Sequence, residues 1–300
     1  MHVTRSAQPS DVSTTGLHHI TAVCSGGKRN VRFYTKVLGL SFVKKTVNQD
    51  DVSSYHLYYG DDTGSPGTLI TFFTWDLPAG RSGHPFATSI SFSVGDLDAW
   101  KDHLSRHGVV FEVFERFTEE TLRFADPDGL IVYLSEYPMP SRTPSGTPPM
   151  HGVSGAGLSL ADPGASIGLL RAFGFTEVFE DGDVTRYVHP DSSTFIEVAK
   201  DATRGALGSG SIHHVAFGVD PDDQERVRQG IISRGFSVTQ IIERFYFRSA
   251  YFREANGSLF EIASNGPGFF VDEEVLGSRL VLPPWLEAHR ERIEKGLPEL

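Results

Sequence analysis

The chain has 300 residues, of which 39% are hydrophobic and 22% are charged. This length suits one large or two ordinary domains, and this balance is typical of a globular chain rather than a disordered one. The net charge is −11, and no basic cluster occurs beyond Lys44 and Lys45, which argues against a nucleic-acid partner. The single cysteine, Cys24, excludes an intramolecular disulfide and a cysteine-based metal cluster.

The sequence also argues against contact with a membrane. It contains nothing close to the run of about 20 apolar residues that a transmembrane helix needs. Residues 1–15 are polar and lack the apolar core of a signal peptide, so we interpret them as a flexible leader. A lone cysteine fits a reducing compartment, and we expect a cytoplasmic location.

Internal repetition is the most informative feature of the chain. A strand-like run with paired histidines, His18 and His19, occurs at residues 16–23 and precedes a short helix that ends near Gly39. A similar run at residues 211–217 contains His213 and His214, and a helix expected at residues 224–234 follows it.

Two further units lack the histidines. One starts near residue 86 and contains an expected helix at 97–107, and the other starts near residue 153 with an expected helix at 165–173. We therefore predict an α+β fold of four βαβββ modules that form two open, cup-like half-barrels. Modules one and two cover residues 16–137, a linker covers 138–150, and modules three and four cover 151–266. Residues 267–300 form a C-terminal extension with a helix predicted at 286–295.

A metal site is predicted when the four modules are aligned. Histidines occupy the same first-strand position in modules one and four, and a carboxylate, Glu261, occupies the last strand of module four. Two neutral imidazoles and one carboxylate are the ligand set of non-haem Fe(II) oxygenases, whereas Mn(II) and Zn(II) are alternatives. Glu197 lies at the comparable last-strand position of module three without a histidine nearby, so we interpret it as structural or exposed.

Strand geometry alone does not decide which histidine of each pair faces the metal. Side chains alternate along a regular strand, so His18 and His19 should point to opposite faces, as should His213 and His214. Either member of each pair could face inward on this argument.

These segments resemble the glyoxalase/bleomycin-resistance/extradiol dioxygenase (vicinal oxygen chelate) superfamily, and within it the hydroquinone, chlorohydroquinone and MhqO-type ring-cleaving dioxygenases. The resemblance extends over about residues 16–298. The residues that carry it lie at 16–21, 44–48, 55–61, 213–217, 251–254 and 259–263.

The resemblance implies a ligand set and several pocket residues. It assigns Fe(II), or alternatively Mn(II), to His19, His214 and Glu261. It implies catalytic or pocket roles for the following residues: His18, Thr21, His213, Arg244 and Tyr251. Arg244 would stabilise negative charge on oxygen, or else form a surface salt bridge with Glu243 or another acid.

The resemblance also bears on how the modules pair. Other extradiol enzymes of the superfamily take their first histidine from module three, where this chain has Ala156. We therefore expect modules one and four to share the metal site and modules two and three to form a metal-free partner.

The activity implied is an Fe(II)-dependent, extradiol-type cleavage of the ring of a hydroquinone or catechol by O₂. The partners implied are a small aromatic diol and O₂, and the sequence leaves open whether the chain forms a homo-oligomer. Two alternatives remain: a glyoxalase-type isomerase or lyase, and a non-catalytic small-molecule-binding resistance protein. Tyr133, at the last-strand position of module two, counts against the glyoxalase type, which carries a glutamate in each half of its site.

Overall fold

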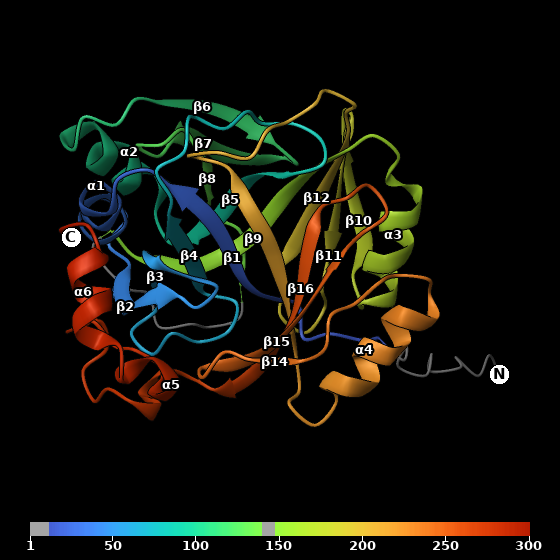
Figure 1. The fold of residues 1–300 in the computed structure, drawn as a ribbon. Coiled ribbons are helices and arrows are strands. Elements are labelled where there is room, and N and C mark those ends of the chain that lie inside the picture. The colour runs from blue at the N-terminus through green and yellow to red at the C-terminus, as the bar shows by residue number, and fades with distance from the viewer. Residues whose placement is uncertain (1–11, 140–147) are drawn as a thin grey trace.

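The computed structural model describes residues 12–139 and 148–300, which form two curled eight-stranded sheets (Figure 1). The first sheet has the strand order β14-β15-β16-β13-β1-β4-β3-β2. Its strands are β1 (Leu17–Cys24), β2 (Ser41–Asn48), β3 (Asp51–Gly60), β4 (Leu69–Thr74), β13 (Ile212–Val219), β14 (Ile242–Glu243), β15 (Phe247–Arg253) and β16 (Leu259–Pro267).

The second sheet has the corresponding order β10-β11-β12-β9-β5-β8-β7-β6. Its strands are β5 (Ala87–Val94), β6 (Phe111–Arg116), β7 (Glu119–Ala125), β8 (Ile131–Ser135), β9 (Met150–Leu160), β10 (Thr176–Asp181), β11 (Val184–Val188) and β12 (Phe195–Lys200). In both sheets two βαβββ units meet through an antiparallel pair of first strands, β1 with β13 and β5 with β9. The predicted α+β fold of two half-barrels is confirmed.

The strands nearest the chain ends therefore lie in one sheet, and the strands from the middle of the chain form the other. One hydrophobic core joins them, because Ile20 and Ala22 of β1 belong to the same buried cluster as Ile90 and Phe92 of β5. Alternation along β1 then places His19 and Thr21 on the opposite face, inside the cup of the first sheet. The core thus fixes which face of β1 is available for a site.

The helices are short and lie outside the sheets (Figure 1). They are α1 (Gly27–Arg32), which continues as a π-helical turn (Phe33–Val37), α2 (Leu97–Arg106), α3 (Pro163–Ala172), α4 (Gln224–Ser233), a 3₁₀ turn (Phe269–Val271), α5 (Pro284–Glu287) and α6 (Arg290–Gly296). The Asp96 side chain caps α2 by accepting from the Ala99 backbone N–H, and Gly108 follows α2 with a φ of 70°. Within the described residues, no helix combines the length and apolarity needed to cross a membrane.

Two predictions made for the chain ends need correction. Val12 and Thr14 are buried, and the Thr14 backbone N–H donates to the Phe173 carbonyl, so the flexible leader predicted for 1–15 is wrong for residues 12–15. Residues 1–11, and the 140–147 part of the predicted linker, lie outside the described residues. The single helix predicted at 286–295 is broken into α5 and α6, and the break lets Ile293 pack against Val47 and Leu282.

A buried lysine attaches the C-terminal extension to the first sheet. Lys44 on β2 is fully buried, and its Nζ lies 2.7 Å from an Asp272 oxygen and 2.5 Å from a Glu273 oxygen. The ammonium also lies 4.9 Å from the centre of the Tyr246 ring. A buried charge that loses its partners is costly, so these contacts make the extension part of the fold.

We expect Lys44→Met to lower the free energy of unfolding by about 3–5 kcal/mol, because it leaves two carboxylates without their buried cation. Urea unfolding followed by circular dichroism would measure the loss. Lys45→Met is the matched control, since the ion pairs of the described residues do not include Lys45, and it should change stability by no more than about 0.5 kcal/mol. Equal losses in both variants would contradict this role for Lys44.

Candidate metal centre

The histidine pairs of β1 and β13 lie at two β-bulges. The register between the strands shifts at two places, and the extra residues are His18 on β1 and His213 on β13. The expectation that the two histidines of a pair point to opposite faces is therefore wrong. A bulge interrupts the alternation, and the ring of each extra histidine contacts its neighbour, Nδ1 to Nδ1, at 2.9 Å for His18–His19 and 2.8 Å for His213–His214.

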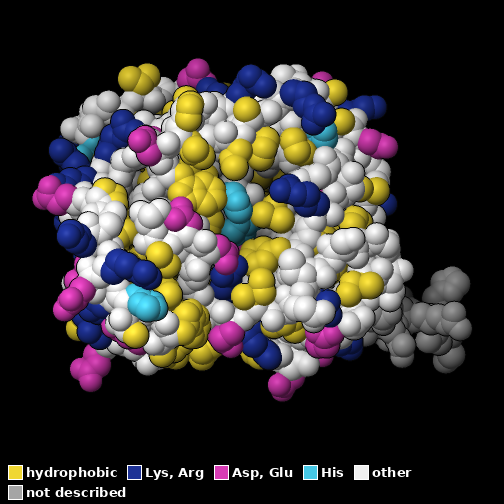
Figure 2. Space-filling view, in the orientation of Figure 1, with side chains coloured by type: hydrophobic (Ala, Val, Ile, Leu, Met, Phe, Trp, Pro, Cys, Tyr) yellow, Lys and Arg dark blue, Asp and Glu magenta, His cyan; other side chains and the backbone are white. Residues whose placement is uncertain are grey.

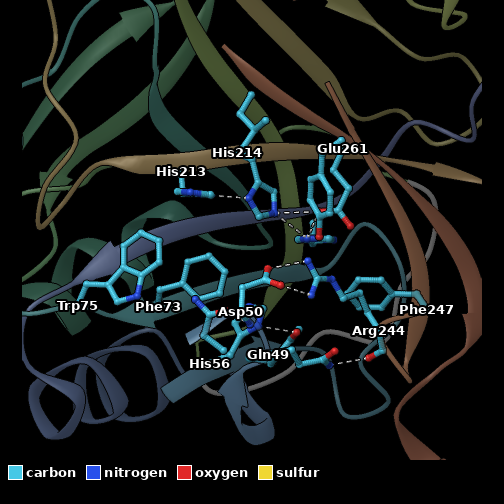
Figure 3. Close-up of a pocket in the computed structure, with 15 residues that line it drawn as sticks. Gln49, Asp50, His56, Phe73, Trp75, His213, His214, Arg244, Phe247 and Glu261 are labelled. Atoms are coloured by element: carbon cyan, nitrogen blue, oxygen red, sulfur yellow. Dashed lines mark hydrogen bonds and ion pairs between the residues drawn. The ribbon is translucent and has the colours of Figure 1, made fainter. Parts of the chain in front are cut away.

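The second histidine of each pair, His19 or His214, has a ligand atom close to one of Glu261 on β16. Figure 3 shows His214 pointing toward Glu261. The Nε2 atoms of His19 and His214 are 3.3 Å apart. They lie 3.4 Å and 2.9 Å, respectively, from Oε2 of Glu261. All three side chains are buried. The β1–β13 pairing and the parallel β13–β16 pairing together create this convergence.

The electrostatics of the site favour an ionised Glu261 carboxylate and a neutral His214 imidazole. Burial would raise the pKa of Glu261, but the charge of His19 and hydrogen bonds from both histidines outweigh it and hold the pKa well below its usual range. Burial lowers the pKa of His214, although Glu261 opposes this shift. Neutral imidazole and carboxylate are the forms that bind metal ions.

The ligand atoms have the spacing that a metal ion requires. With bonds of about 2.1 Å, two ligands at right angles lie about 3.0 Å apart, and two at a tetrahedral angle about 3.4 Å apart. The three observed distances, 2.9, 3.3 and 3.4 Å, fall in this range. Apart from these imidazole contacts, neither carboxylate oxygen of Glu261 has a hydrogen-bond partner among the described residues, although both are buried. A divalent cation would satisfy this carboxylate, so the three residues fit a metal ion.

The Nδ1–Nδ1 contacts determine which imidazole nitrogens could bind a metal. Two neutral imidazoles in contact need one donor and one acceptor. For His19 to present a lone pair at Nε2, its Nδ1–H must donate to Nδ1 of His18, and the same holds for His214 and His213. Burial lowers the pKa of His18 and of His213 to about 3, so both are neutral acceptors at neutral pH. A hydrogen bond to the Ser264 backbone also fixes the orientation of the His18 ring.

A cavity of about 330 Å³ lies against these ligands, and histidine is visible at the bottom of a hollow among hydrophobic side chains (Figure 2). Phe73 and Trp75 stack with ring centres 4.9 Å apart on one wall, and Phe247 contacts the rings of His18 and His19 opposite. The following residues line it: His19, Asn48, Gln49, Asp50, His56, Tyr58, Phe73, Trp75, His213, His214, Arg244, Phe247, Tyr251, Leu259 and Glu261. The cavity is thus a flat-walled, largely apolar slot above the ligands.

Arg244 and Tyr251 both line this cavity. The Arg244 guanidinium donates to both carboxylate oxygens of Asp50, at 3.0 and 2.7 Å, and lies 5.6 Å from the centre of the Tyr251 ring (Figure 3). Two roles were considered for Arg244, stabilisation of negative charge on oxygen and a surface salt bridge. The salt bridge is present, with Asp50 as the partner. The pair lines the cavity. Glu243 instead accepts from the Phe245 backbone N–H. Burial raises the pKa of Tyr251, which therefore keeps its phenolic proton at neutral pH.

Thr21 does not line the cavity. Its hydroxyl lies 2.8 Å from that of Thr71, which lies 2.8 Å from Nε2 of His56, and Nδ1 of His56 lies 2.8 Å from the Tyr58 hydroxyl. His18 lies behind His19, also outside the lining. Of the five pocket residues that the resemblance implied, three line the cavity: His213, Arg244 and Tyr251. Thr21 instead supports His56.

Sequence reasoning missed several lining residues, including Asp50, His56 and Trp75. Asp50 follows β2, and His56 lies on β3, within the segment 55–61 that carried part of the family resemblance. Only the order of strands in the first sheet brings β2 and β3 opposite β14 and β15. His56 and Tyr58 lie two residues apart on β3, so their side chains point to the same face. A histidine and a tyrosine on one face of a strand are the signal that could have identified His56.

The equivalent positions of the second sheet are filled differently. Glu197 on β12 pairs with Arg186 on β11 as Glu261 pairs with Tyr251. Arg186 binds one Glu197 oxygen from two nitrogens, at 3.0 and 2.8 Å, and Arg116 lies 2.6 Å from the other. The sequence left two interpretations of Glu197, structural or exposed. The second is wrong, because the Glu197 side chain is buried. In the second sheet guanidinium groups neutralise the buried carboxylate, whereas in the first sheet two histidines contact it.

We expect His19→Ala, His214→Ala and Glu261→Gln each to weaken metal binding by more than about 100-fold, since each removes one of three ligands. Elemental analysis of protein loaded anaerobically with Fe(II) or Mn(II) and then dialysed would measure the bound metal. His107→Ala, which removes an exposed histidine after α2, should retain the metal. Unchanged metal content in the three ligand variants would contradict this site.

The contact behind His19 gives a separate prediction. His18→Phe keeps an aromatic ring but removes the acceptor of the His19 Nδ1–H, so the metal affinity should fall by about 10–100-fold. Competition with a coloured chelator would measure it. His103→Phe is the matched control, because it also removes a buried histidine, one whose Nε2 contacts the Val37 carbonyl far from the site. An affinity loss of equal size in the control would show that general destabilisation, and not orientation of His19, is responsible.

Comparison with known proteins places this chain in a family. Residues 16–134 match the family described as "Glyoxalase/Bleomycin resistance protein/Dioxygenase superfamily". Over 306 aligned residues the chain is 40% identical to "Putative ring-cleaving dioxygenase MhqE" of Bacillus subtilis, with 96% of this chain and 100% of the relative covered. It is 32% identical to "Chlorohydroquinone/hydroquinone 1,2-dioxygenase" of Sphingobium indicum, with 93% and 94% covered. A crystal structure of a "putative dioxygenase" from Bacillus subtilis superposes with a TM-score of 0.91 at 37% identity, covering 96% of this chain and 98% of that one.

Proposed function

Because the chain belongs to the glyoxalase/bleomycin resistance protein/dioxygenase superfamily, we propose that it is a metal-dependent ring-cleaving dioxygenase. Its substrate would be a hydroquinone- or catechol-type diol and its co-substrate O₂. The hydroquinone part of this proposal agrees with the name of the Sphingobium relative. The observation that carries this proposal is the convergence of His19, His214 and Glu261 at the floor of an aromatic-walled cavity. Fe(II) is the metal proposed, with Mn(II) as the alternative, and a cytoplasmic location remains a prediction.

The bound metal would favour ionisation of a diol hydroxyl and supply the redox chemistry that O₂ requires. The protein's part is to hold the ring and to exclude water. Phe73 and Trp75 on one wall and Phe247 on the other suit a flat aromatic ring. A cavity of about 330 Å³ is at the small end of the range for ligand sites, roughly 300–1,000 Å³, and fits a single substituted ring.

Tyr251 is the residue best placed to act on the substrate oxygen. It lines the cavity beside His214, with ring centres 5.9 Å apart, and it stays protonated at neutral pH. Its O–H can donate to a diol oxygen or to an oxygen on which negative charge develops. Arg244, which lies against the Tyr251 ring, holds that ring in place. His213 contributes to the wall and orients His214.

The site argues against the glyoxalase-type alternative. That type carries a glutamate in each half of its site, whereas Glu261 is the one carboxylate that contacts His19 and His214 within the described residues. The other candidate carboxylate, Glu197, is held by Arg186 in the second sheet. The resistance-protein alternative needs a ligand cavity but no metal-binding triad, so retention of stoichiometric metal would argue against it.

Oxygen uptake tests the proposal directly. Protein loaded anaerobically with Fe(II) should consume O₂ when hydroquinone, chlorohydroquinone or catechol is added, with one O₂ used for each diol and a ring-opened product seen by mass spectrometry. Parallel samples loaded with Mn(II) and Zn(II) would identify the active metal. Metal-loaded protein that consumes no O₂ with any of these diols would contradict the dioxygenase proposal.

We expect Tyr251→Phe to lower kcat by about 100-fold with little change in bound metal, because it removes the hydroxyl but keeps the ring. Stopped-flow or electrode measurements of O₂ uptake under saturating diol would show this. Tyr133→Phe, at the last-strand position of module two, is the matched control and should keep the wild-type rate. A Tyr251→Phe enzyme with the wild-type kcat would exclude a role for this hydroxyl in the reaction.

A further inference from the structure

Two loops from opposite ends of the chain meet at the cavity. Asp50 lies in the turn between β2 and β3, and Arg244 follows β14. The Asp50 carboxylate accepts from both terminal nitrogens of Arg244, at 3.0 and 2.7 Å, and the Gln49 side chain donates to the Arg244 carbonyl at 3.0 Å (Figure 3). These contacts hold one loop against the other, and both Asp50 and Arg244 line the cavity.

The pair determines which charges the cavity wall presents to a ligand. Arg244, Asp50 and Glu261 are the charged residues of the lining, and Arg244 is the one cation among them. Its side chain is 15% exposed, and one face of the guanidinium lies over Tyr251. Both of its terminal nitrogens, the donors that would bind a carboxylate in the bidentate arrangement, are already bound to Asp50.

We infer that Asp50 is a specificity-determining residue, which occupies Arg244 and so restricts the cavity to diols whose other ring substituents carry no negative charge. A ring carboxylate that enters the slot would lie near Asp50 and find no free cation in the wall. This inference rests on the proposed function, because it concerns the diol of that reaction. It assigns the discrimination to the Asp50–Arg244 pair and not to the metal ligands.

Physical arguments support Asp50 as an effective competitor for Arg244. An ion pair within one chain competes with a free carboxylate at a high effective concentration, and the Gln49 contact holds the Asp50 turn close to its partner. The Asp50 side chain is 74% exposed, so the pair adds little to stability, as is usual for exposed ion pairs. Replacing Asp50 should therefore leave the fold intact while it changes the charge that a ligand meets.

The test compares Asp50→Asn with wild type in the full-length, metal-loaded chain. Asparagine keeps the shape of the side chain and one acceptor but removes the negative charge. We expect the ratio of kcat/KM for gentisate over hydroquinone, and for protocatechuate over catechol, to rise at least tenfold. Anaerobic calorimetry should show the same gain in the affinity for gentisate relative to hydroquinone, which gives a readout independent of turnover.

Two further variants establish the mechanism. Asp51→Asn removes the same charge from the adjacent residue, whose carboxylate binds Ser53 rather than Arg244, and it should leave the ratio unchanged. The double variant Asp50→Asn with Arg244→Gln should lose the gain in gentisate binding, because the freed cation is then absent. A gain that persists without Arg244, or that appears equally in Asp51→Asn, would overturn the inference.

The outcomes separate this inference from the proposed function. If hydroquinone drives O₂ uptake but Asp50→Asn leaves both ratios at the wild-type value, the inference fails and the function stands. If no diol drives O₂ uptake but calorimetry shows a gain in gentisate binding that depends on Arg244, the inference stands and the function fails. A wild-type protein that binds gentisate as well as hydroquinone would also overturn the inference.

Discussion

The antiparallel pairing of β1 with β13 is the interaction on which the site depends. These strands come from opposite ends of the chain, and the pairing places His19 and His214 on one face of a continuous sheet. The two bulges in this ladder bring His18 and His213 beside their neighbours, Nδ1 to Nδ1. A regular ladder would have turned those rings to the other face, so the bulges both aim the inner histidines and supply their supporting hydrogen bonds.

The two sheets show how one fold can either build or fill a site. Both have a buried glutamate at the same register position, Glu261 in the first and Glu197 in the second. A buried carboxylate needs a cation or several donors close by. In the second sheet Arg186 and Arg116 provide it from within the chain. In the first sheet the carboxylate contacts two imidazoles and no guanidinium, so its charge remains available to a metal ion.

The cavity is made by contacts between segments distant in sequence. The β2–β3 turn meets the loop after β14 through Asp50 and Arg244, and the buried Lys44 fixes the C-terminal extension beneath β2. The three ligands, Phe73 and Phe247 thus lie on strands, which hold atoms rigidly, whereas the Asp50–Arg244 pair that we infer to select among ligands lies outside the strands. This division lets the turns change specificity without disturbing the ligand set.

The sequence by itself determined the repeated βαβββ pattern and the α+β class, because histidine pairs and helix-ending glycines recur at corresponding places, and its motifs resembled those of the family. It also placed Glu261 and the two histidine pairs as candidates. It left open which histidine of each pair faces inward, and the alternation rule gave the wrong geometry, because a bulge depends on the partner strand. Asp50 and Trp75 could not be assigned to the cavity, because the strand order that brings them there depends on the whole sheet. The local sequence pattern determines the period of a strand. The packing of the whole chain decides which strands become neighbours and where the register between them shifts.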